Sequence, residues 1–259
     1  MFNLQSLLPI FLSLLAGLST VIGAFIVFFS KSGNKKMITF ALSFSAGVMI
    51  TLSFTDLLPT AEKALSEHFG IFTGIMLSLL FLIIGVLIAM LIDLFLSSEK
   101  EYSSSKNQNN NLYKVGFVSM IALMLHNFPE GIATYISGYQ NISLGINLAI
   151  AIALHNIPEG IAIAMPIYYS SKSKGKAFKY TFISGIAEPI GAIFAFLFLK
   201  PYINDLILGV IFALVTGIML YISFEELIPE ARLYGYNKLY IFSLVLGICI
   251  IPISHIFQI

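Results

Sequence analysis

The chain has 259 residues, of which 58% are hydrophobic and 10% charged, with a formal net charge of +1. Soluble domains average about 25% charged residues, so the composition predicts an integral membrane protein. The small net charge argues against a nucleic-acid partner, and a single cysteine, Cys249, excludes both an internal disulfide framework and a cysteine-rich zinc site.

Eight segments are apolar over the length of about 20 residues that a membrane span requires. In chain order they cover roughly residues 7–29, 37–60, 71–96, 115–137, 144–169, 177–199, 203–226 and 239–257. The connections are short, so we expect one polytopic, all-α domain over residues 1–259. The N-terminus lacks the basic start and cleavage site of a signal peptide, so we interpret it as the first span.

The basic residues predict how these spans are oriented, because inner loops carry an excess of lysine and arginine. With the N-terminus outside, the inner loops hold twelve of the basic residues and the outer loops hold two, Lys63 and Lys200. We therefore expect a multi-pass protein of the cell (inner) membrane with both termini outside. The chain would then be embedded in the lipid bilayer.

One six-residue motif occurs twice, in the fourth and fifth spans. His-Asn-Phe-Pro-Glu-Gly at 126–131 returns as His-Asn-Ile-Pro-Glu-Gly at 155–160, 29 positions later. Ionisable residues inside a membrane are costly and are usually functional. The two spans run in opposite directions, so the copies are inverted.

A second pair of similar segments lies in spans two and seven. Ser-Phe-Thr-Asp-Leu-Leu-Pro-Thr-Ala at 53–61 resembles Ser-Phe-Glu-Glu-Leu-Ile-Pro-Glu-Ala at 223–231. These spans also run in opposite directions, which predicts an inverted 3+2+3 repeat. Such repeats, with a site between the halves, are typical of secondary transporters, although duplicated membrane domains also occur in proteins that transport nothing.

The spacing within the motif predicts a metal site. Positions i and i+4 share one face of a helix, so His126 points with Glu130, and His155 with Glu159, while Asn127 and Asn156 flank those faces. Imidazole and carboxylate together suit zinc, and also iron, cobalt, nickel or manganese. Glu188 in span six adds a third carboxylate, so a cluster of two metal ions is an alternative to a single ion. The alternative for a single copy is a hydrogen-bonded helix contact.

Further acids lie toward the ends of other spans. Asp56 in span two precedes Pro59 and is a candidate entrance residue. Asp93, Glu225 and Glu226 at the inner ends of spans three and seven form a candidate exit. Acids at the interface, paired with nearby basic residues, are the alternative. We expect Met49 and Met219 to be packing residues.

These motifs resemble the ZIP (Zrt/Irt-like) family of metal-ion transporters, in particular its GufA-like bacterial branch, over the whole chain. The resemblance implies uptake of divalent metal into the cytoplasm, usually zinc, often with iron, manganese or cadmium. It implies two neighbouring sites that share glutamates. The residues that would form them are His126, Asn127, Glu130, His155, Asn156, Glu159 and Glu188.

Two departures from the family pattern concern the span three–four loop and span five. The loop over 98–113 contains no histidine and is rich in Ser, Asn and Lys, which indicates a flexible linker and argues against metal capture there. Span five varies at its first motif position among family members, and His155 makes the first site richer in nitrogen.

We therefore expect a carrier for divalent transition metal rather than an enzyme. A passive metal channel is one alternative. An intramembrane zinc hydrolase is another, but the His-Glu-x-x-His pattern of zinc proteases is absent from the sequence. Metal preference, a coupling ion and the oligomeric state, a homodimer included, stay open.

Overall fold

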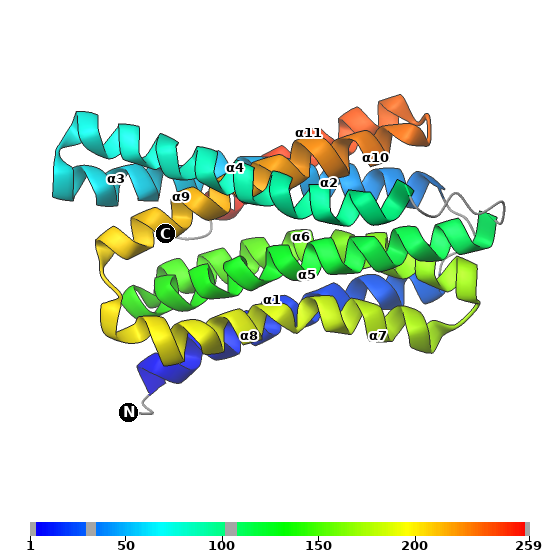
Figure 1. The fold of residues 1–259 in the computed structure, drawn as a ribbon, viewed down its shortest axis with the longest axis horizontal. Coiled ribbons are helices and arrows are strands. Elements are labelled where there is room, and N and C mark those ends of the chain that lie inside the picture. Colours follow the sequence, from blue (N-terminus) through cyan, green and yellow to red (C-terminus); the bar gives the residue numbers. More distant parts are fainter. Residues whose placement is uncertain (1–3, 30–34, 102–107, 257–259) are drawn as a thin grey trace.

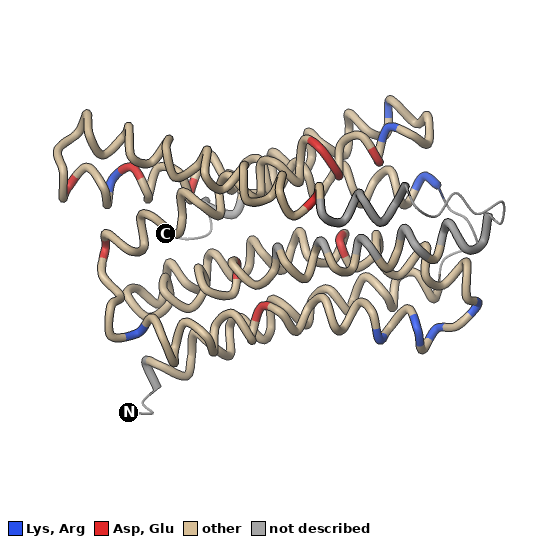
Figure 2. The backbone as a smooth tube through the Cα atoms, in the orientation of Figure 1, with Lys and Arg blue, Asp and Glu red and all other residues tan. Residues whose placement is uncertain are grey.

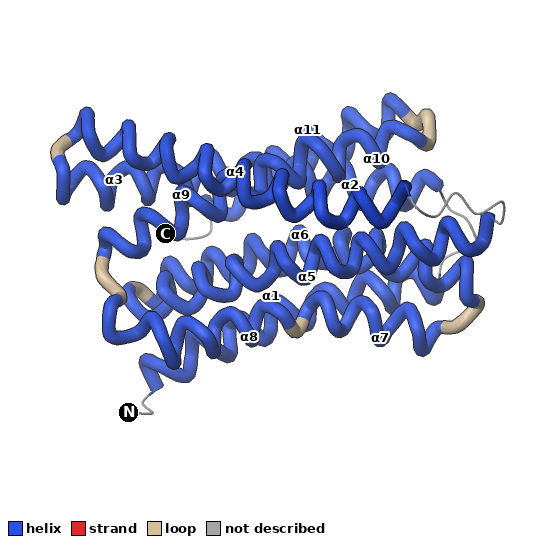
Figure 3. The backbone as a smooth tube through the Cα atoms, viewed as in Figure 1, coloured by secondary structure: helices blue, strands red, loops and turns tan. Residues whose placement is uncertain are grey.

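The computed structural model describes residues 4–29, 35–101 and 108–256, and no β-strand occurs in these ranges. Its helices join end to end into eight rods (Figures 1 and 3). The rods are α1 (Leu4–Phe29); α2 (Lys35–Leu52) with η1 (Ser53–Leu57) and α3 (Leu58–Phe69); α4 (Ile71–Glu101); α5 (Gln108–Gln140); α6 (Ile142–Ser171); α7 (Lys174–Gly185) with α8 (Ala187–Phe194), η2 (Ala195–Leu199) and η3 (Lys200–Tyr202); α9 (Asp205–Tyr221) with η4 (Ile222–Leu227) and α10 (Ile228–Leu233); and α11 (Asn237–Ile256).

Each of the eight predicted spans corresponds to one rod, which confirms the all-α membrane architecture. Within the described residues, six rods are long and apolar enough to cross a membrane, and 237–253 forms a shorter apolar helix. At several ends the helices extend beyond the predicted spans. The second rod continues to Phe69, and helix occupies much of the predicted linker, up to Glu101 and again from Gln108.

The extension past residue 60 has a clear physical cause. Ala61, Ala64 and Leu65 are buried at helical spacing, and the polar residues between them form the other face of α3. Helix α3 packs on α4 and α9. Gly70 ends it with a φ of 84°, a conformation that favours glycine.

The rods form two layers (Figure 1). We call α1, α5, α6 and α7–α8 the motif layer, since its members pack mainly on one another. The frame layer consists of α2–α3, α4, α9–α10 and α11, in which α2 packs on α11 and α4 on α9. Contacts between layers run chiefly from α2 to α6 and from α5 to α9. Spans four and five therefore share a layer with spans one and six.

Glycine contacts within the frame layer reveal its inverted symmetry. Gly47 of α2 crosses Gly247 of α11, and a Cβ on either would overlap a backbone carbonyl of the other helix. Gly217 of α9 crosses α4 beside Gly85 in the same way. Spans two and eight thus meet as spans seven and three do. Close backbone approach at small residues is a usual mode of helix packing in lipid.

The matched segments of spans two and seven share an uncommon geometry. Both η1 and η4 are π-helical, and each ends immediately before a Leu-Pro or Ile-Pro pair, at Pro59 and Pro229. Exposed and buried residues follow the same order along the two segments, with Phe54 and Phe224 about equally exposed. Short π-helical turns occur often at functional sites.

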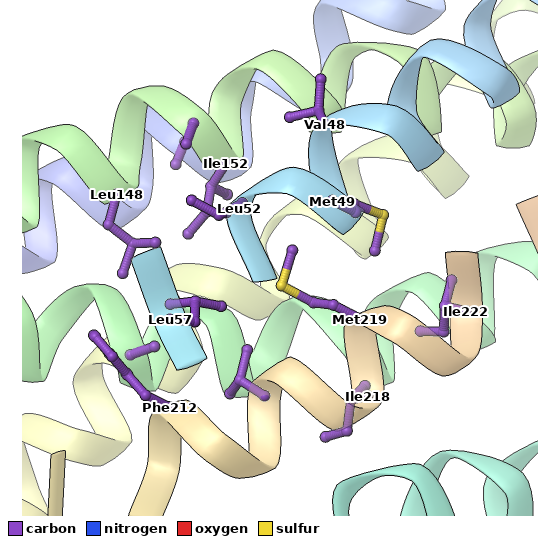
Figure 4. Close-up of a cluster of buried hydrophobic side chains, with 14 of the residues drawn as sticks. Val48, Met49, Leu52, Leu57, Leu148, Ile152, Phe212, Ile218, Met219 and Ile222 are labelled. Carbon is purple, nitrogen blue, oxygen red and sulfur yellow. The ribbon is translucent and has the colours of Figure 1, made fainter. Parts of the chain in front are cut away.

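The two layers meet across an apolar surface. Figure 4 shows Leu148 and Ile152 of α6 beside Leu52 of α2, with Met49 and Met219 opposite one another. Met49 and Met219 are 0% and 1% exposed and belong to one cluster of buried hydrophobic residues, which confirms that they are packing residues.

Basic residues gather at one end of the rods, which we call the basic end (Figure 2). It includes the junction of α6 with α7 and that of α10 with α11, which hold Lys172, Lys174, Arg232 and Lys238. Lys200 lies at the opposite end, where its Nζ donates to Ser6 Oγ at 2.8 Å and faces the rings of Tyr139 and Phe196.

Candidate metal site

Both copies of the motif lie near the middle of long helices in the motif layer. α5 carries the first copy and α6 the second, and both helices continue through Pro129 and Pro158 without interruption. Glu130 and Glu159 are 1% and 0% exposed. The side chain of His126 lies outside the described part of the structure, although its backbone belongs to α5.

One imidazole and one carboxylate meet across the two copies. Nε2 of His155 lies 3.2 Å from Oε1 and 3.4 Å from Oε2 of Glu130, and both side chains are buried. His155, the first residue of the second copy, therefore meets Glu130, the fifth residue of the first copy. The sequence predicts only that the histidine and glutamate of the same copy share one helix face. A frame-layer hydroxyl also reaches this helix, because Ser45 Oγ donates to the His155 carbonyl at 3.4 Å.

The two asparagines are held in equivalent ways by neighbouring helices. Nδ2 of Asn127 donates to the Ser184 carbonyl at 3.2 Å, and Nδ2 of Asn156 donates to the Ala16 carbonyl at 3.0 Å. With each amide nitrogen bonded, the Oδ1 atom of each asparagine is the remaining acceptor. Neither Oδ1 has a hydrogen-bond partner among the described residues, and both are buried.

Glu188 completes the group from span six. It is fully buried, its Oε1 accepts from Asn156 Nδ2, and it lies close enough to Glu130 and Glu159 for electrostatic interaction. The rod is interrupted at Ile186, between α7 and α8, so Glu188 stands in the first turn of α8. Pro189 lacks the N–H that would bond the Gly185 carbonyl, which favours a break at this point.

This arrangement leaves oxygen atoms that a cation would satisfy. Buried polar atoms are nearly always hydrogen-bonded, yet the second oxygen of Glu188 and the two asparagine oxygens have no partner in the described part of the chain. Together with Glu130, Glu159 and His155, they offer carboxylate, amide and imidazole ligands, a set that suits zinc and its neighbours in the transition series.

The imidazole and carboxylate groups of the described residues do not enclose an ion by themselves. Among them, no three side chains of the His, Cys, Asp or Glu type converge closely enough to hold a metal. The amide oxygens of Asn127 and Asn156 would therefore have to contribute. His126 belongs to the predicted set, but its side chain is not among those described.

The predicted exit residues lie near one another toward the basic end of the frame layer. Tyr221 donates its hydroxyl to Asp93 Oδ2 at 3.2 Å, which links α9 to α4. Glu225 and Glu226 are near enough to act electrostatically on that hydroxyl. Tyr221 was not predicted as a site residue. The only feature of the sequence that could have indicated it is a phenol within an apolar span.

The predicted entrance residue, Asp56, lies in η1, where it accepts a hydrogen bond from the hydroxyl of Thr55. Asp56 and Glu226 occupy equivalent positions of the two π-helical segments, each partly exposed. Neither belongs to the group around Glu188, which is built only from the motif layer.

Comparisons with known proteins agree with the motif. A model of the family described as ZIP zinc transporter matches residues 96–254. The chain is 44% identical to the zinc transporter ZupT of Streptococcus mutans over 249 residues, which are 94% of each chain. It is 45% identical to ZupT of Chlorobaculum parvum over 254 residues, again 94% of each chain. For ZupT of Clostridium perfringens the identity is 41%, over 97% of this chain and 96% of the relative.

Proposed function

The chain belongs to the ZIP zinc transporter family. On that premise we propose that it moves divalent transition metal ions, principally zinc, into the cytoplasm by alternating access. The metal is the cargo of this step. The ligands we propose are His126, Asn127, Glu130, His155, Asn156, Glu159 and Glu188.

A single observation carries the proposed site. Three oxygen atoms of Asn127, Asn156 and Glu188 are buried without a hydrogen-bond partner in the described residues. An unsatisfied buried polar atom costs roughly 1–3 kcal/mol, and three such atoms among the proposed ligands indicate that something else binds there. A divalent cation supplies what all three lack.

The layered fold supports a carrier rather than a channel. All seven proposed ligands belong to the motif layer, so they can travel together past the frame layer. The surface between the layers is apolar around Leu52, Ile152 and Met219, and such a surface offers an ion no continuous path of ligands. Inverted repeats allow two pseudo-symmetric arrangements of one chain.

Several finer features belong to the proposal as well. The basic end would face the cytoplasm, with both termini outside. Asp56 would meet the ion before the site, and Asp93, Glu225 and Glu226 would meet it afterwards. Two ions would share Glu130 and Glu159. The protein would have no enzymatic activity.

Uptake into liposomes tests this function. Purified protein reconstituted with a zinc-sensitive dye inside should give zinc uptake that saturates with concentration, and protein-free liposomes should give none. Competition by iron, manganese and cadmium would rank the metals. Flux that rises without saturation would favour a passive channel, and no flux for any divalent metal would contradict the proposal.

A further inference from the structure

The motif layer has an internal two-fold relation that assigns a partner to Glu188. Adding 29 to a residue number takes α5 onto α6, and adding 168 takes α1 onto the span-six rod, so Gly17 corresponds to Gly185 and Gly23 to Gly191. Under the same rule, Thr20 of α1 corresponds to Glu188.

Independent contacts obey this relation. Asn127 donates to Ser184 just as Asn156 donates to Ala16. A Cβ on Gly191 would overlap the Phe128 carbonyl, as one on Gly23 would overlap the Ile157 carbonyl.

Two further contacts complete the relation. A Cβ on Gly131 would overlap the Glu188 carbonyl, and one on Gly160 would overlap the Thr20 carbonyl. Gly17 and Gly185 lie against one another, where a two-fold axis would place them. Thr20 is thus placed against the second copy of the motif as Glu188 is placed against the first.

The Thr20 hydroxyl is buried and unused by the protein. Its side chain is 0% exposed, and Oγ1 has no hydrogen-bond partner in the described part of the chain. A helical threonine normally bonds the carbonyl four residues earlier. Here that carbonyl belongs to Ala16, which already accepts from Ser19 Oγ at 2.6 Å and from Asn156 Nδ2 at 3.0 Å.

Thr20 differs from other buried hydroxyls by its position. Thr134 and Ser53 also lack partners among the described residues, but neither corresponds to a proposed ligand. Oγ1 of Thr20 points toward α7, 3.0 Å from where a Cβ of Gly185 would lie. The backbone carbonyl of Thr20 lies against Gly160, the residue after Glu159.

We propose that the Thr20 hydroxyl is a neutral oxygen ligand of the transported metal, opposite Glu188 in the motif layer. The inference rests on the proposed function. It gives the site a carboxylate at one symmetry position and a hydroxyl at the other. A fourth carboxylate would bind divalent ions more tightly, and a neutral oxygen lets the ion leave more readily.

Zinc binding to purified full-length protein tests this role. Thr20→Val keeps the volume and removes the hydroxyl, so zinc affinity should fall by about tenfold, the effect of losing one polar contact to a charged group. Thr20→Ser should bind as the wild type does. Thr20→Asp should bind about tenfold more tightly and release zinc more slowly in uptake assays.

Metal-free stability separates a ligand from a structural hydroxyl. Thr20→Val should melt no lower than the wild type without metal, since it removes an unsatisfied buried group, and its stabilisation by zinc should shrink. Thr181→Val is the matched control, because Thr181 is buried in span six and donates to the Ala177 carbonyl at 2.9 Å. It should melt lower than the wild type and bind zinc normally.

The outcomes distinguish this inference from the proposed function. If wild type binds zinc saturably and Glu159→Ala does not, but Thr20→Val binds within about twofold of wild type, the Thr20 assignment alone is overturned. Weaker zinc binding by Thr20→Val would also overturn it if this variant melted lower than the wild type without metal. Unchanged zinc affinity in Thr20→Asp would overturn it as well. If wild type binds no divalent metal, the proposed function itself fails.

Discussion

Nε2 of His155 lies 3.2 Å from Oε1 of Glu130, so the two inverted copies of the motif are joined directly across the α5–α6 interface. The contact pairs different positions of the two copies and is completely buried. An ion bound there would be held by both helices at once. Damage to either copy should therefore affect the whole site.

Glu130→Ala and Glu159→Ala should each abolish zinc uptake in liposomes while leaving membrane insertion intact. Each removes a charged ligand that both proposed ions share. Glu67→Ala is the matched control, because Glu67 is an exposed acid on α3, and it should transport normally. Near-normal uptake in either motif variant would remove the basis for a site shared by two helices.

Glu188→Ala should reduce uptake less severely than either motif glutamate, since Glu188 would serve only one of the two ions. The measurement is the ratio of maximal uptake rates among Glu188→Ala, Glu130→Ala and wild type. Equal and complete loss in the two variants would show that Glu188 is as central as the motif residues and would contradict the division into two sites.

Replacing His155 should alter metal selectivity. Imidazole favours zinc over harder ions such as manganese, so His155→Ala should weaken zinc uptake more than manganese uptake in competition assays. His126→Ala should act in the same direction. His68→Ala, a change at an exposed histidine near the end of α3, should leave both metals unaffected. Equal losses for the two metals would indicate that the imidazoles are structural.

Gly131→Ala should destabilise the motif layer, because the new methyl group would overlap the Glu188 carbonyl. Overpacking of this kind costs about 1–3 kcal/mol, so the melting temperature in detergent should fall and uptake should decline with it. Gly175→Ala is the control, since a Cβ there meets only Ser173 Oγ at 3.9 Å. Equal melting temperatures for the two variants would contradict the close approach of α5 and α8.

Alternating access can be tested with single cysteines on the two sides of the α5 motif. After Cys249→Ser removes the native thiol, Leu123→Cys lies toward the basic end and Thr134→Cys beyond Glu130. In a carrier, conditions that expose one cysteine to a water-soluble thiol reagent should protect the other. Simultaneous labelling of both, under every metal condition, would replace the carrier with a channel.

Much of the fold follows from hydropathy and internal similarity. Eight apolar segments predict eight rods, and the second repeat pair correctly predicts matched structures in spans two and seven. The connection after residue 60, which was not predicted to be helical, forms α3, and Ala61, Ala64 and Leu65 supply its apolar face. This apolar pattern is weak in the sequence beside several charged residues, and the structure shows that it packs on α4 and α9.

The geometry of the candidate site was less accessible from sequence. The motif spacing identifies faces on each helix, but the contact of His155 with Glu130 depends on how α5 and α6 are rotated against one another. The correspondence of Thr20 with Glu188 was hidden for another reason. Spans one and six share little more than glycines, and their relation emerges only from backbone contacts such as that of Gly17 with Gly185.

The buried acids of the motif layer also determine how membrane voltage acts on the proposed movement. With Glu130, Glu159 and Glu188 ionised, the empty site carries three negative charges; one divalent ion leaves a single negative charge, and two ions leave a single positive charge. Each charge crossing the whole membrane field is worth about 2.3 kcal/mol per 100 mV. An inside-negative cell would oppose inward movement with one ion, favour it with two, and return the empty site outward, so voltage itself would select the doubly loaded carrier.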